Sequence, residues 1–395
     1  MERLSIFVHR ASDCLTDYES HGDGLITYSL LNGLAKRNHK IFAYATHAFI
    51  HEKRPNLNLI IREKHIAPFG SLINWEHWVR ANGKFKLLNK KHDFNLVWRM
   101  YPYGRSCPMI PETLGKPLVV GPLPYSWPFS KDILAKPRFS IGLAALLAPF
   151  EEQGWFHTLK TASLIICLTK HFAIEMQKRF PISKVIYLPP PIDPPFNRSN
   201  IIRKSPNLLR PLRLMFVANF FPYKNPLMFC EIVKLLLEQN IRVQATMIGS
   251  GPESAEIKKY CIEHRLENTV ALTGKIPHRD VYSRLLEADI LISTSLGEPY
   301  GLNIAEAMSV GTPCICHNSG GPAEIIEDRK DGLLVTELNA QSFADVVTSI
   351  YADEELWNTL SKNAISKARQ WSSERILPEL ENWLYKICEK DPPVS

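Results

Sequence analysis

The residues of this chain best suited to chemistry lie in one short segment, 290–313, which reads ILISTSLGEPYGLNIAEAMSVGTP. Its apolar start fits a buried parallel strand, and a glycine and a proline then end that strand. We expect a helix from Gly301 or Leu302, where the N–H groups of the first turn suit a phosphate. Glu306 lies one turn into this helix and can accept two hydrogen bonds from a ribose diol, while Glu298 approaches from the turn. Two acids beside an anion site predict a sugar-nucleotide ligand.

The elements that must position this segment alternate between strands and helices along the second half of the chain. This alternation predicts a parallel sheet with helices on both faces. Strands are expected at 213–218, 243–248, 270–272, 290–292, 314–316 and 333–335, and helices at 225–238, 253–264, 280–288, from 301 or 302, around 324–325, and at 341–352, 354–369 and 376–388.

The first half of the chain shows the same alternation. Gly22 and Gly24 fall in a polar turn, 17–24, where they could let the backbone approach a ligand; a tight turn without a ligand is the alternative. Aromatic loops at 99–111 and 121–128 suit an acceptor sugar, and plain packing is the alternative there. Strands are expected at 4–9, 41–45, 94–98, 117–121, 162–168 and 184–188, and helices at 25–36, 71–88 and 170–180.

The length of 395 residues predicts two domains, and a proline-rich stretch marks the boundary between them. Five prolines within 189–195 stop any regular element, and a polar segment follows. We expect an acceptor-binding domain over 1–197, a linker over 198–211, a nucleotide-sugar domain over 212–370, and a C-terminal helix over 371–395 that packs back toward the first domain.

Composition narrows the class of protein. Hydrophobic residues make up 45% and charged residues 22% of the chain, as in soluble globular proteins. Its eight cysteines show neither metal-ligand spacing nor a disulfide framework, which favours a reducing cytoplasm. No signal peptide is evident, and the longest apolar stretch, 141–150, is too short to span a bilayer.

A net charge of +7 and an isoelectric point near 8.9 favour anionic partners, although a basic surface without a specific partner is the alternative. The sequence shows no motif that reads nucleic acid. The basic, aromatic stretch 71–88 could lie on an anionic membrane surface, or its aromatics could be the buried side of a helix. We therefore expect a cytoplasmic protein with an option of peripheral contact at the inner face of the membrane.

Six motifs, in this order, resemble the donor domain of glycosyltransferase family 4. They are YKNP, IGSGP, EPYGLNIAEA, AMSVGTP, SGGPAEII and DGLLV, and the resemblance is close over 212–335. It implies an α/β fold of the GT-B type, with two Rossmann-like domains whose parallel sheets face a central cleft. It also implies a retaining transfer of a hexose-type sugar from a nucleoside-diphosphate sugar to a hydroxyl of a glycan, a lipid-linked glycan or a small molecule.

The resemblance also implies roles for individual residues. Lys224 corresponds to the lysine that binds the diphosphate, and Glu298 to the glutamate that contacts the transferred sugar near its anomeric carbon. Glu306 corresponds to the ribose carboxylate. Backbone N–H groups at the helix start would hold the diphosphate, which adds Gly301, Leu302 and Asn303, with Tyr300 beside them.

The base and the rest of the nucleotide are implied to meet backbone rather than side chains. The backbone around Lys275 and Ile276 would contact the base, and Gly249 and Gly251 would leave room for the nucleotide. No metal ion and no cofactor is expected, because Lys224 and the helix start would stabilise the leaving diphosphate. Front-face displacement is favoured over a covalent intermediate.

Two positions depart from the family pattern. Asn219 stands where the family commonly has an arginine, and Trp98 and Arg99 stand where a histidine is often found near the reaction centre. Arg99 is a candidate to supply the missing charge. The alternatives to a transferase are a GT-B nucleotide-sugar epimerase and a noncatalytic, degenerate nucleotide-sugar-binding protein; a phosphorylase would need a pyridoxal-binding lysine and a longer chain.

Overall fold

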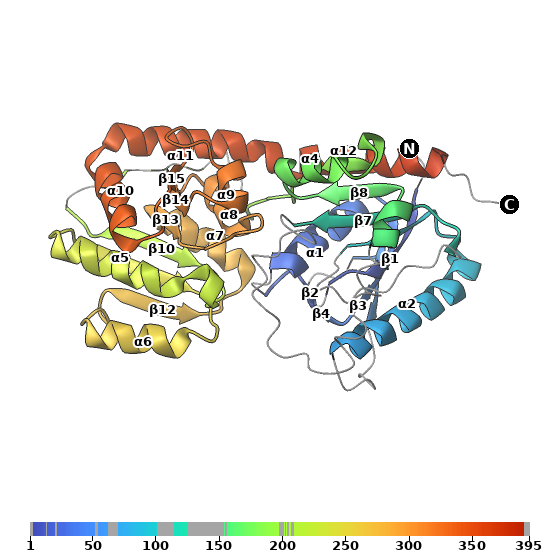
Figure 1. The fold of residues 1–395 in the computed structure, drawn as a ribbon, viewed down its shortest axis with the longest axis horizontal. Helices are drawn as coiled ribbons and strands as arrows, with labels where there is room; N and C mark the ends of the chain where they lie inside the picture. The colour runs from blue at the N-terminus through green and yellow to red at the C-terminus, as the bar shows by residue number, and fades with distance from the viewer. Residues whose placement is uncertain are drawn as a thin grey trace. The chain divides into compact units, whose positions relative to one another are not determined.

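The computed structural model describes residues 3–12, 14–19, 22–51, 54–61, 70–100, 114–124, 154, 156–196, 201, 203, 205–206 and 209–390. The chain forms two compact units, coloured by position in Figure 1. Unit 1 comprises residues 1–191 and 373–395, and unit 2 comprises 192–372. The chain therefore passes between the units at 191/192 and 372/373, where the sequence led us to expect 197/198 and 370/371.

Unit 1 is built on a parallel sheet whose strand order is β5-β3-β1-β6-β7-β8-β9. A second, two-stranded sheet pairs β2 with β4. The strands are β1 (Ser5–Arg10), β2 (Cys14–Thr16), β3 (Lys40–Ala45), β4 (His47–Phe49), β5 (Leu57–Ile61), β6 (Leu96–Arg99), β7 (Leu118–Leu123), β8 (Leu164–Cys167) and β9 (Val185–Tyr187). The helices are α1 (Gly22–Lys36), α2 (Gly70–His92), α4 (Lys170–Gln177), the short 3₁₀ helix η2 (Ile182–Lys184) and α12 (Ser373–Lys390).

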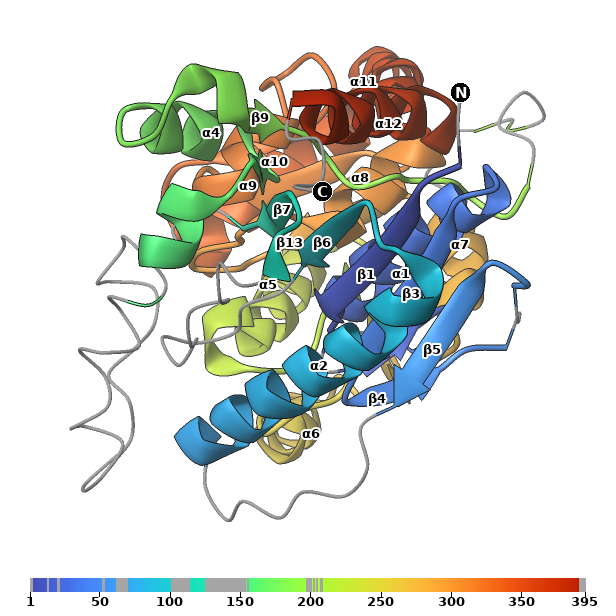
Figure 2. The same ribbon diagram turned by 90° about the vertical axis from the view of Figure 1, so that its right-hand side faces the viewer.

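The central strands of unit 1 are apolar on both faces because helices cover both faces. Strands β1, β6 and β7 are buried along almost their whole length. Helix α2 packs on β1 and lies along the sheet in Figure 2. Phe7 of β1 meets Phe85 of α2 and Phe94, each with ring centroids 5.3 Å apart, so the sheet and α2 share one aromatic core.

The C-terminal helix α12 belongs to the core of unit 1 and packs on α1. Gly33 of α1 makes this approach close, because a Cβ there would lie 2.5 Å from a methyl of Leu377. The buried carboxylate of Glu381 accepts from His39 Nε2 at 2.7 Å and pairs with Arg37 at 2.6 Å. The last helix of the chain thus completes a unit that the first residues begin.

Unit 2 is built on a parallel sheet in the order β12-β11-β10-β13-β14-β15, the doubly wound order in which the chain reverses direction beside its first strand. The strands are β10 (Leu212–Val217), β11 (Val243–Ile248), β12 (Val270–Gly274), β13 (Ile290–Ser293), β14 (Cys314–His317) and β15 (Leu333–Val335). The helices are η4 (Pro222–Lys224), α5 (Pro226–Glu238), α6 (Ser254–Glu263), α7 (His278–Glu287), α8 (Leu302–Ser309), α9 (Gly320–Ile325), α10 (Ala340–Ala352), α11 (Glu354–Ala368) and η5 (Arg369–Trp371).

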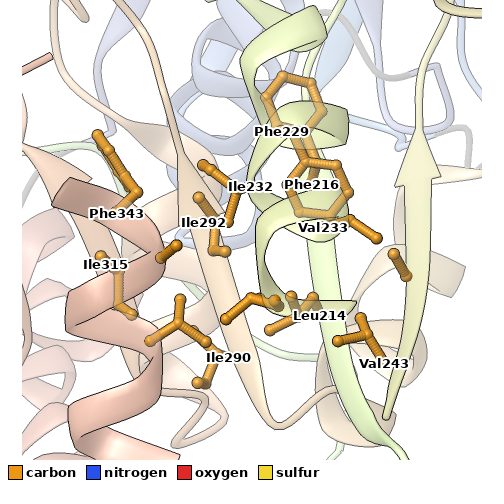
Figure 3. Close-up of a cluster of buried hydrophobic side chains, with 14 of the residues drawn as sticks. Leu214, Phe216, Phe229, Ile232, Val233, Val243, Ile290, Ile292, Ile315 and Phe343 are labelled. Carbon is orange, nitrogen blue, oxygen red and sulfur yellow. The ribbon is translucent and has the colours of Figure 1, made fainter. Parts of the chain in front are cut away.

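The core of unit 2 lies between its sheet and the layer of α5, α6 and α10 (Figure 3). Phe216 from β10 packs on Phe229 from α5 with ring centroids 5.6 Å apart. Ile290, Ile292 and other strand residues of the same sheet face complete this cluster. On another side, α7, α9 and α11 contact α8, the helix that begins at the candidate site.

The α/β class and the alternation of elements expected from the sequence are confirmed. The end of the polar turn expected over 17–24 is wrong, because α1 already begins at Gly22. Gly24 lies in the first turn of this helix, and a Cβ there would fall under 3.0 Å from the carbonyl oxygen of Cys14 in β2. The short strands β2, β4 and β5 were not expected, since none of them forms a long apolar run.

Candidate functional site

The candidate site of unit 2 lies where its strand order reverses. Strands β10 and β13 are neighbours in the sheet, but their following helices lead to opposite directions along it. Loops at such a switch point diverge at the carboxyl ends of the strands, which is where open α/β sheets bind ligands. The loop after β10 carries Lys224, and the loop after β13 carries Glu298.

Lys224 and Glu298 meet directly, although they are 74 positions apart in the chain. Lys224 Nζ donates to Glu298 Oε2, and the two side chains are only 15% and 10% exposed. Ser295 Oγ donates to the same carboxylate oxygen at 3.3 Å. Thr294 Oγ1 donates to the carbonyl oxygen of Lys224 at 3.1 Å and thereby ties the two loops together. The two residues expected to be catalytic therefore form one partly buried ion pair.

A pair of glycines holds the turn that carries Glu298. Gly321 N–H donates to the carbonyl oxygen of Glu298 at 2.7 Å. A Cβ on Gly320 would lie 2.6 Å from that same oxygen, and a Cβ on Gly321 would lie under 3.0 Å from the carbonyl oxygen of Tyr300. Tyr300 itself is buried. The two glycines of the SGGPAEII motif thus let the backbone of the 298–300 turn pack directly on the backbone of this segment.

The start of α8 is shaped as the sequence predicted, with Leu302 as its first residue. Gly301 precedes it with φ of 99°, a left-handed conformation that favours glycine. The carbonyl oxygen of Gly301 accepts from the N–H groups of Ile304 and Ala305, so the helix begins here. The N–H groups of its first turn have no acceptor within the helix and can bind a ligand. Asn303 donates from Nδ2 to the carbonyl oxygen of Val217 at 2.9 Å, which anchors the helix start to the end of β10.

Glu306, the expected ribose carboxylate, is buried and hydrogen-bonded to His278 of α7. His278 Nε2 lies 2.5 Å from Glu306 Oε1. Burial lowers the pKa of His278, but the charge and the hydrogen bond of Glu306 outweigh burial and raise the pKa above 6.5. Sequence reasoning missed His278; its only signal was a histidine three positions after Lys275, where a helix begins.

The two glycines expected to make room for a nucleotide lie where two loops of unit 2 approach each other closely. A Cβ on Gly249 would lie under 3.0 Å from the carbonyl oxygen of Ala218, and one on Gly251 would lie 2.5 Å from that of Phe220. Phe220 N–H also donates to the carbonyl of Ser250 at 2.9 Å. Gly249 and Gly251 therefore let the loop after β11 pack against the loop after β10, and their expected role of leaving room for the nucleotide stays a prediction.

The remaining expected donor-site residues lie around the same strand ends. Asn219 is partly buried in the loop after β10, and its carbonyl accepts from Phe221 N–H at 2.9 Å. Lys275 is exposed and Ile276 partly buried in the segment between β12 and α7. Gly249 N–H donates to Gly274 O at 3.0 Å, which joins that segment to the end of β11.

The expected acceptor-side residues lie in unit 1. Arg99 ends β6 and is the register partner of Arg10 at the end of β1, again where the strand order reverses. Burial and the charge of Arg10 lower the pKa of Arg99 to about 9. Burial and, to a smaller extent, the positive charge of Arg99 lower the pKa of His9 to about 3, so this histidine is neutral at physiological pH. His9 was not identified from the sequence.

Gly22 and Gly24 were expected in a loop, but both lie in the first turn of α1. Gly22 is exposed with open space around it, and Gly24 packs on β2. Most of the loops expected to receive the acceptor, 99–111 and 121–128, lies outside the described residues.

Comparisons of the sequence with known proteins find similarity to glycosyltransferases. The family model described as Glycosyl transferases group 1 matches residues 197–367, within unit 2. The UDP-Gal:alpha-D-GlcNAc-diphosphoundecaprenol alpha-1,3-galactosyltransferase of Escherichia coli is 28% identical over 220 residues, which are 53% of this chain and 56% of that protein. The N-acetyl-alpha-D-glucosaminyl L-malate synthase of Bacillus anthracis is 30% identical over 181 residues, 45% of this chain and 46% of that protein. The chain spans about half the length of the curated relatives it matches.

Solved structures match over nearly the whole chain. Sucrose-phosphate synthase from Thermosynechococcus elongatus has a TM-score of 0.71 at 18% identity and covers 99% of this chain and 100% of its own. Anabaena Alr3699/HepE in complex with UDP-glucose has a TM-score of 0.68 at 16% identity and covers 97% and 100%. The expected fold and family are both confirmed: the chain has the GT-B fold, and its segment 197–367 belongs to the glycosyl transferases group 1 family.

Proposed function

We propose that this protein is a retaining glycosyltransferase that moves a hexose-type sugar from a nucleoside-diphosphate sugar to an acceptor hydroxyl. The observation that carries the proposal is the meeting of Lys224 and Glu298 at the switch point of unit 2. A surface lysine and a surface glutamate would have no reason to be held together there, partly buried, by two anchored loops.

The main energetic task of such a transfer is to stabilise negative charge on the departing diphosphate. Lys224 supplies a mobile positive charge, and the N–H groups at the start of α8, near Leu302 and Asn303, supply fixed dipoles. Glu298 would contact the transferred sugar once the donor draws Lys224 toward its phosphates. In the proposed front-face step the acceptor oxygen bonds to the anomeric carbon as the diphosphate leaves, and the diphosphate takes the acceptor's proton.

This division of labour leaves no necessary part for a metal ion or an organic cofactor. In this proposal Lys224 and the N–H groups at the start of α8 supply the positive charge beside the leaving diphosphate. We therefore expect a chelator such as EDTA to leave the transfer rate unchanged. A rate that fell on chelation and returned with added Mg²⁺ would contradict this part of the proposal.

The partners named for relatives suggest where to begin. One matched relative is named for UDP-Gal and a diphosphoundecaprenol acceptor, and one structural neighbour was solved with UDP-glucose. We therefore propose a uridine diphosphate sugar as the first donor to test, with glycan, lipid-linked glycan and small-molecule acceptors. We expect no nucleic-acid partner.

Helix α2 supports the proposal that this is a cytoplasmic protein that makes peripheral contact with the inner face of an anionic membrane. Val79 and Leu87 are 58% and 65% exposed, and the exposed Lys86 and Lys90 lie on the same helical face. The alternative, that the aromatic residues of this stretch form the buried side of a helix, holds for Phe85, which is buried in the core.

Among the helices that the structure describes, none is long and apolar enough to cross a membrane. Sedimentation with anionic and with neutral vesicles tests the contact, and equal binding to both would contradict it.

The function is tested by incubating the protein with a panel of uridine, guanosine and adenosine diphosphate sugars, with and without acceptors. Release of nucleoside diphosphate that requires an acceptor, together with a glycosylated product of retained anomeric configuration, supports the proposal. Release without any acceptor product, or an inverted product, contradicts it.

A second candidate, a noncatalytic nucleotide-sugar-binding protein, is favoured by one observation. Asn219 stands in the loop after β10 where the family commonly has an arginine, so the loop offers one cation fewer to the diphosphate. Tight donor binding without turnover across the panel would support this candidate. A change of the sugar itself in place of its transfer would support the remaining alternative, an epimerase.

A further inference from the structure

The base segment and the ribose carboxylate of the proposed donor site are joined by a histidine. Segment 275–276 follows β12, and α7 begins immediately afterwards with His278. The ring of His278 reaches α8, where Nε2 lies 2.5 Å from Glu306 Oε1. Glu306 is 4% exposed and the side chain of His278 19% exposed, so water competes poorly for this contact.

We infer that His278 is a positioning residue for donor binding, which fixes the carboxylate of Glu306 for the ribose diol and links it to the base segment. This inference rests on the proposed function. A carboxylate has about four lone-pair sites, so one hydrogen bond from His278 sets its orientation and leaves acceptors for two ribose hydroxyls. Without that bond a buried glutamate side chain can rotate, and an acceptor misplaced by about 1 Å loses most of its value.

The surroundings of His278 restrict the orientation of its ring and favour its pairing with Glu306. The ring of Tyr282, one turn along α7, packs on the histidine edge to face at 5.5 Å and limits its rotation. A cation at the start of a helix is disfavoured by the helix dipole, so the positive form of His278 depends on the carboxylate of α8. The two residues therefore depend on each other. The histidine orients the carboxylate, and the carboxylate stabilises the protonated form of the histidine.

The charge of the pair gives the inference a pH signature. Protonated His278 offsets the negative charge of Glu306 close to the expected diphosphate; as the pH rises through the raised pKa of His278, this compensation is lost and donor affinity should fall. Glu306 of α8 is the charged group that raises the pKa of His278. On the histidine's own segment Lys275 is exposed, and Arg279 and Asp280 are exposed and paired with each other at 3.5 Å. They therefore contribute little to the titration.

The test measures binding of a ribonucleotide and of its analogue without the diol. UDP, GDP and ADP are titrated calorimetrically into the full chain, followed by the 2′,3′-dideoxy counterpart of whichever binds. For the unaltered protein we expect the dideoxy analogue to bind about tenfold or more weakly, since the diol donates to a charged acceptor. In His278→Ala the ribonucleotide should bind about tenfold more weakly, and the difference between the two ligands should shrink to about twofold.

Two further variants make the test specific. His278→Gln keeps an N–H donor without the charge, so it should restore most of the affinity and the preference for the diol but lose the fall in affinity above the histidine's pKa. His264→Ala removes an exposed histidine at the end of α6 and should match the unaltered protein. The Gln variant also keeps the test valid if His278→Ala folds poorly, which thermal unfolding would reveal.

The outcomes separate this inference from the function it rests on. If the unaltered chain binds a nucleoside diphosphate and both His278 variants retain its affinity, diol preference and pH profile, the positioning role is refuted while the proposed function stands. If the unaltered chain binds none of the three nucleotides, the proposed function fails and this inference fails with it.

Discussion

Lys224 and Glu298 form an ion pair at the candidate site of unit 2. In the structure the ammonium rests on the carboxylate, so neither charge is left uncompensated in a partly buried place. In the proposed function a donor diphosphate would offer the lysine a stronger partner and release Glu298 toward the sugar. The pair would thus keep both residues in place until a donor binds.

Lys224→Ala should lower turnover far more than donor binding, because in the proposed mechanism the lysine acts chiefly on the charge that develops as the diphosphate leaves. We expect kcat to fall roughly a hundredfold or more, as when one group that stabilises a transition-state anion is removed. Steady-state kinetics with the active donor and acceptor checks this. Lys234→Ala is the control, since Lys234 pairs with Glu238 on the outer surface of α5 in the same unit. Full activity of Lys224→Ala would remove the lysine from the site.

At the scale of elements, the site depends on how closely α9 approaches the turn before α8. Gly321 is the contact point, because its N–H bonds to Glu298 and the place of its missing Cβ is taken by the backbone of Tyr300. The bond and the close approach act on the same three residues, so α9 fixes the turn that carries Glu298.

Gly321→Ala should therefore displace this turn and lower kcat/KM about tenfold or more, even though the new methyl carries no charge. The matched control is Gly83→Ala in α2, where a Cβ meets nothing within 4 Å. That change should leave activity intact and stabilise unit 1 by about 0.5–1 kcal/mol, as expected for glycine to alanine in a helix. Kinetics and thermal unfolding of both variants decide the matter, and an active Gly321→Ala would show that the turn tolerates the shift.

At the scale of the whole molecule, the chain returns to unit 1 after completing unit 2. The buried contact between His39 and Glu381 closes this return across 342 positions of sequence. His39 Nδ1 accepts from the N–H of Leu4 at 3.1 Å, so the proton of the ring lies on Nε2 and is directed at the glutamate. The beginning of β1, the end of α1 and the last helix are thereby joined through one side chain.

Glu381→Gln should destabilise the protein by about 1–3 kcal/mol near neutral pH, because it weakens charge-assisted bonds to Arg37 and His39. Burial raises the pKa of Glu381, but the bonds from Arg37 and His39 outweigh burial and lower it below 4.5. The charged carboxylate therefore stabilises the fold above pH 4.5, and this stabilisation is lost as the pH falls through the lowered pKa.

Denaturant unfolding at several pH values checks this prediction. The difference between the two proteins should be largest near neutral pH and should shrink in acid. Glu374→Gln, an exposed position at the start of the same helix, is the control and should behave as the unaltered protein. A pH-independent difference for Glu381→Gln would mean that packing alone, and not the charge, holds α12.

The α/β alternation, the start of α8 after Gly301 and the candidate residues Lys224, Glu298 and Glu306 could all be predicted from the sequence. These features are local: a strand shows as a short apolar run, a helix as a period of 3.6 residues, and a glycine turn as a break between them. They need only a few neighbouring residues to be recognised, so one sequence was enough for them.

Which of these residues meet depends on the packing of the whole unit. Strand order is a property of the whole sheet; placing β10 beside β13 is what brings Lys224 to Glu298, and the packing of α7 against α8 brings His278 to Glu306. Tertiary packing also gives Gly249 and Gly251 a role that the sequence did not suggest, because the chain's own backbone takes the space that a side chain would need. Such contacts join residues far apart in sequence, and no local pattern records them.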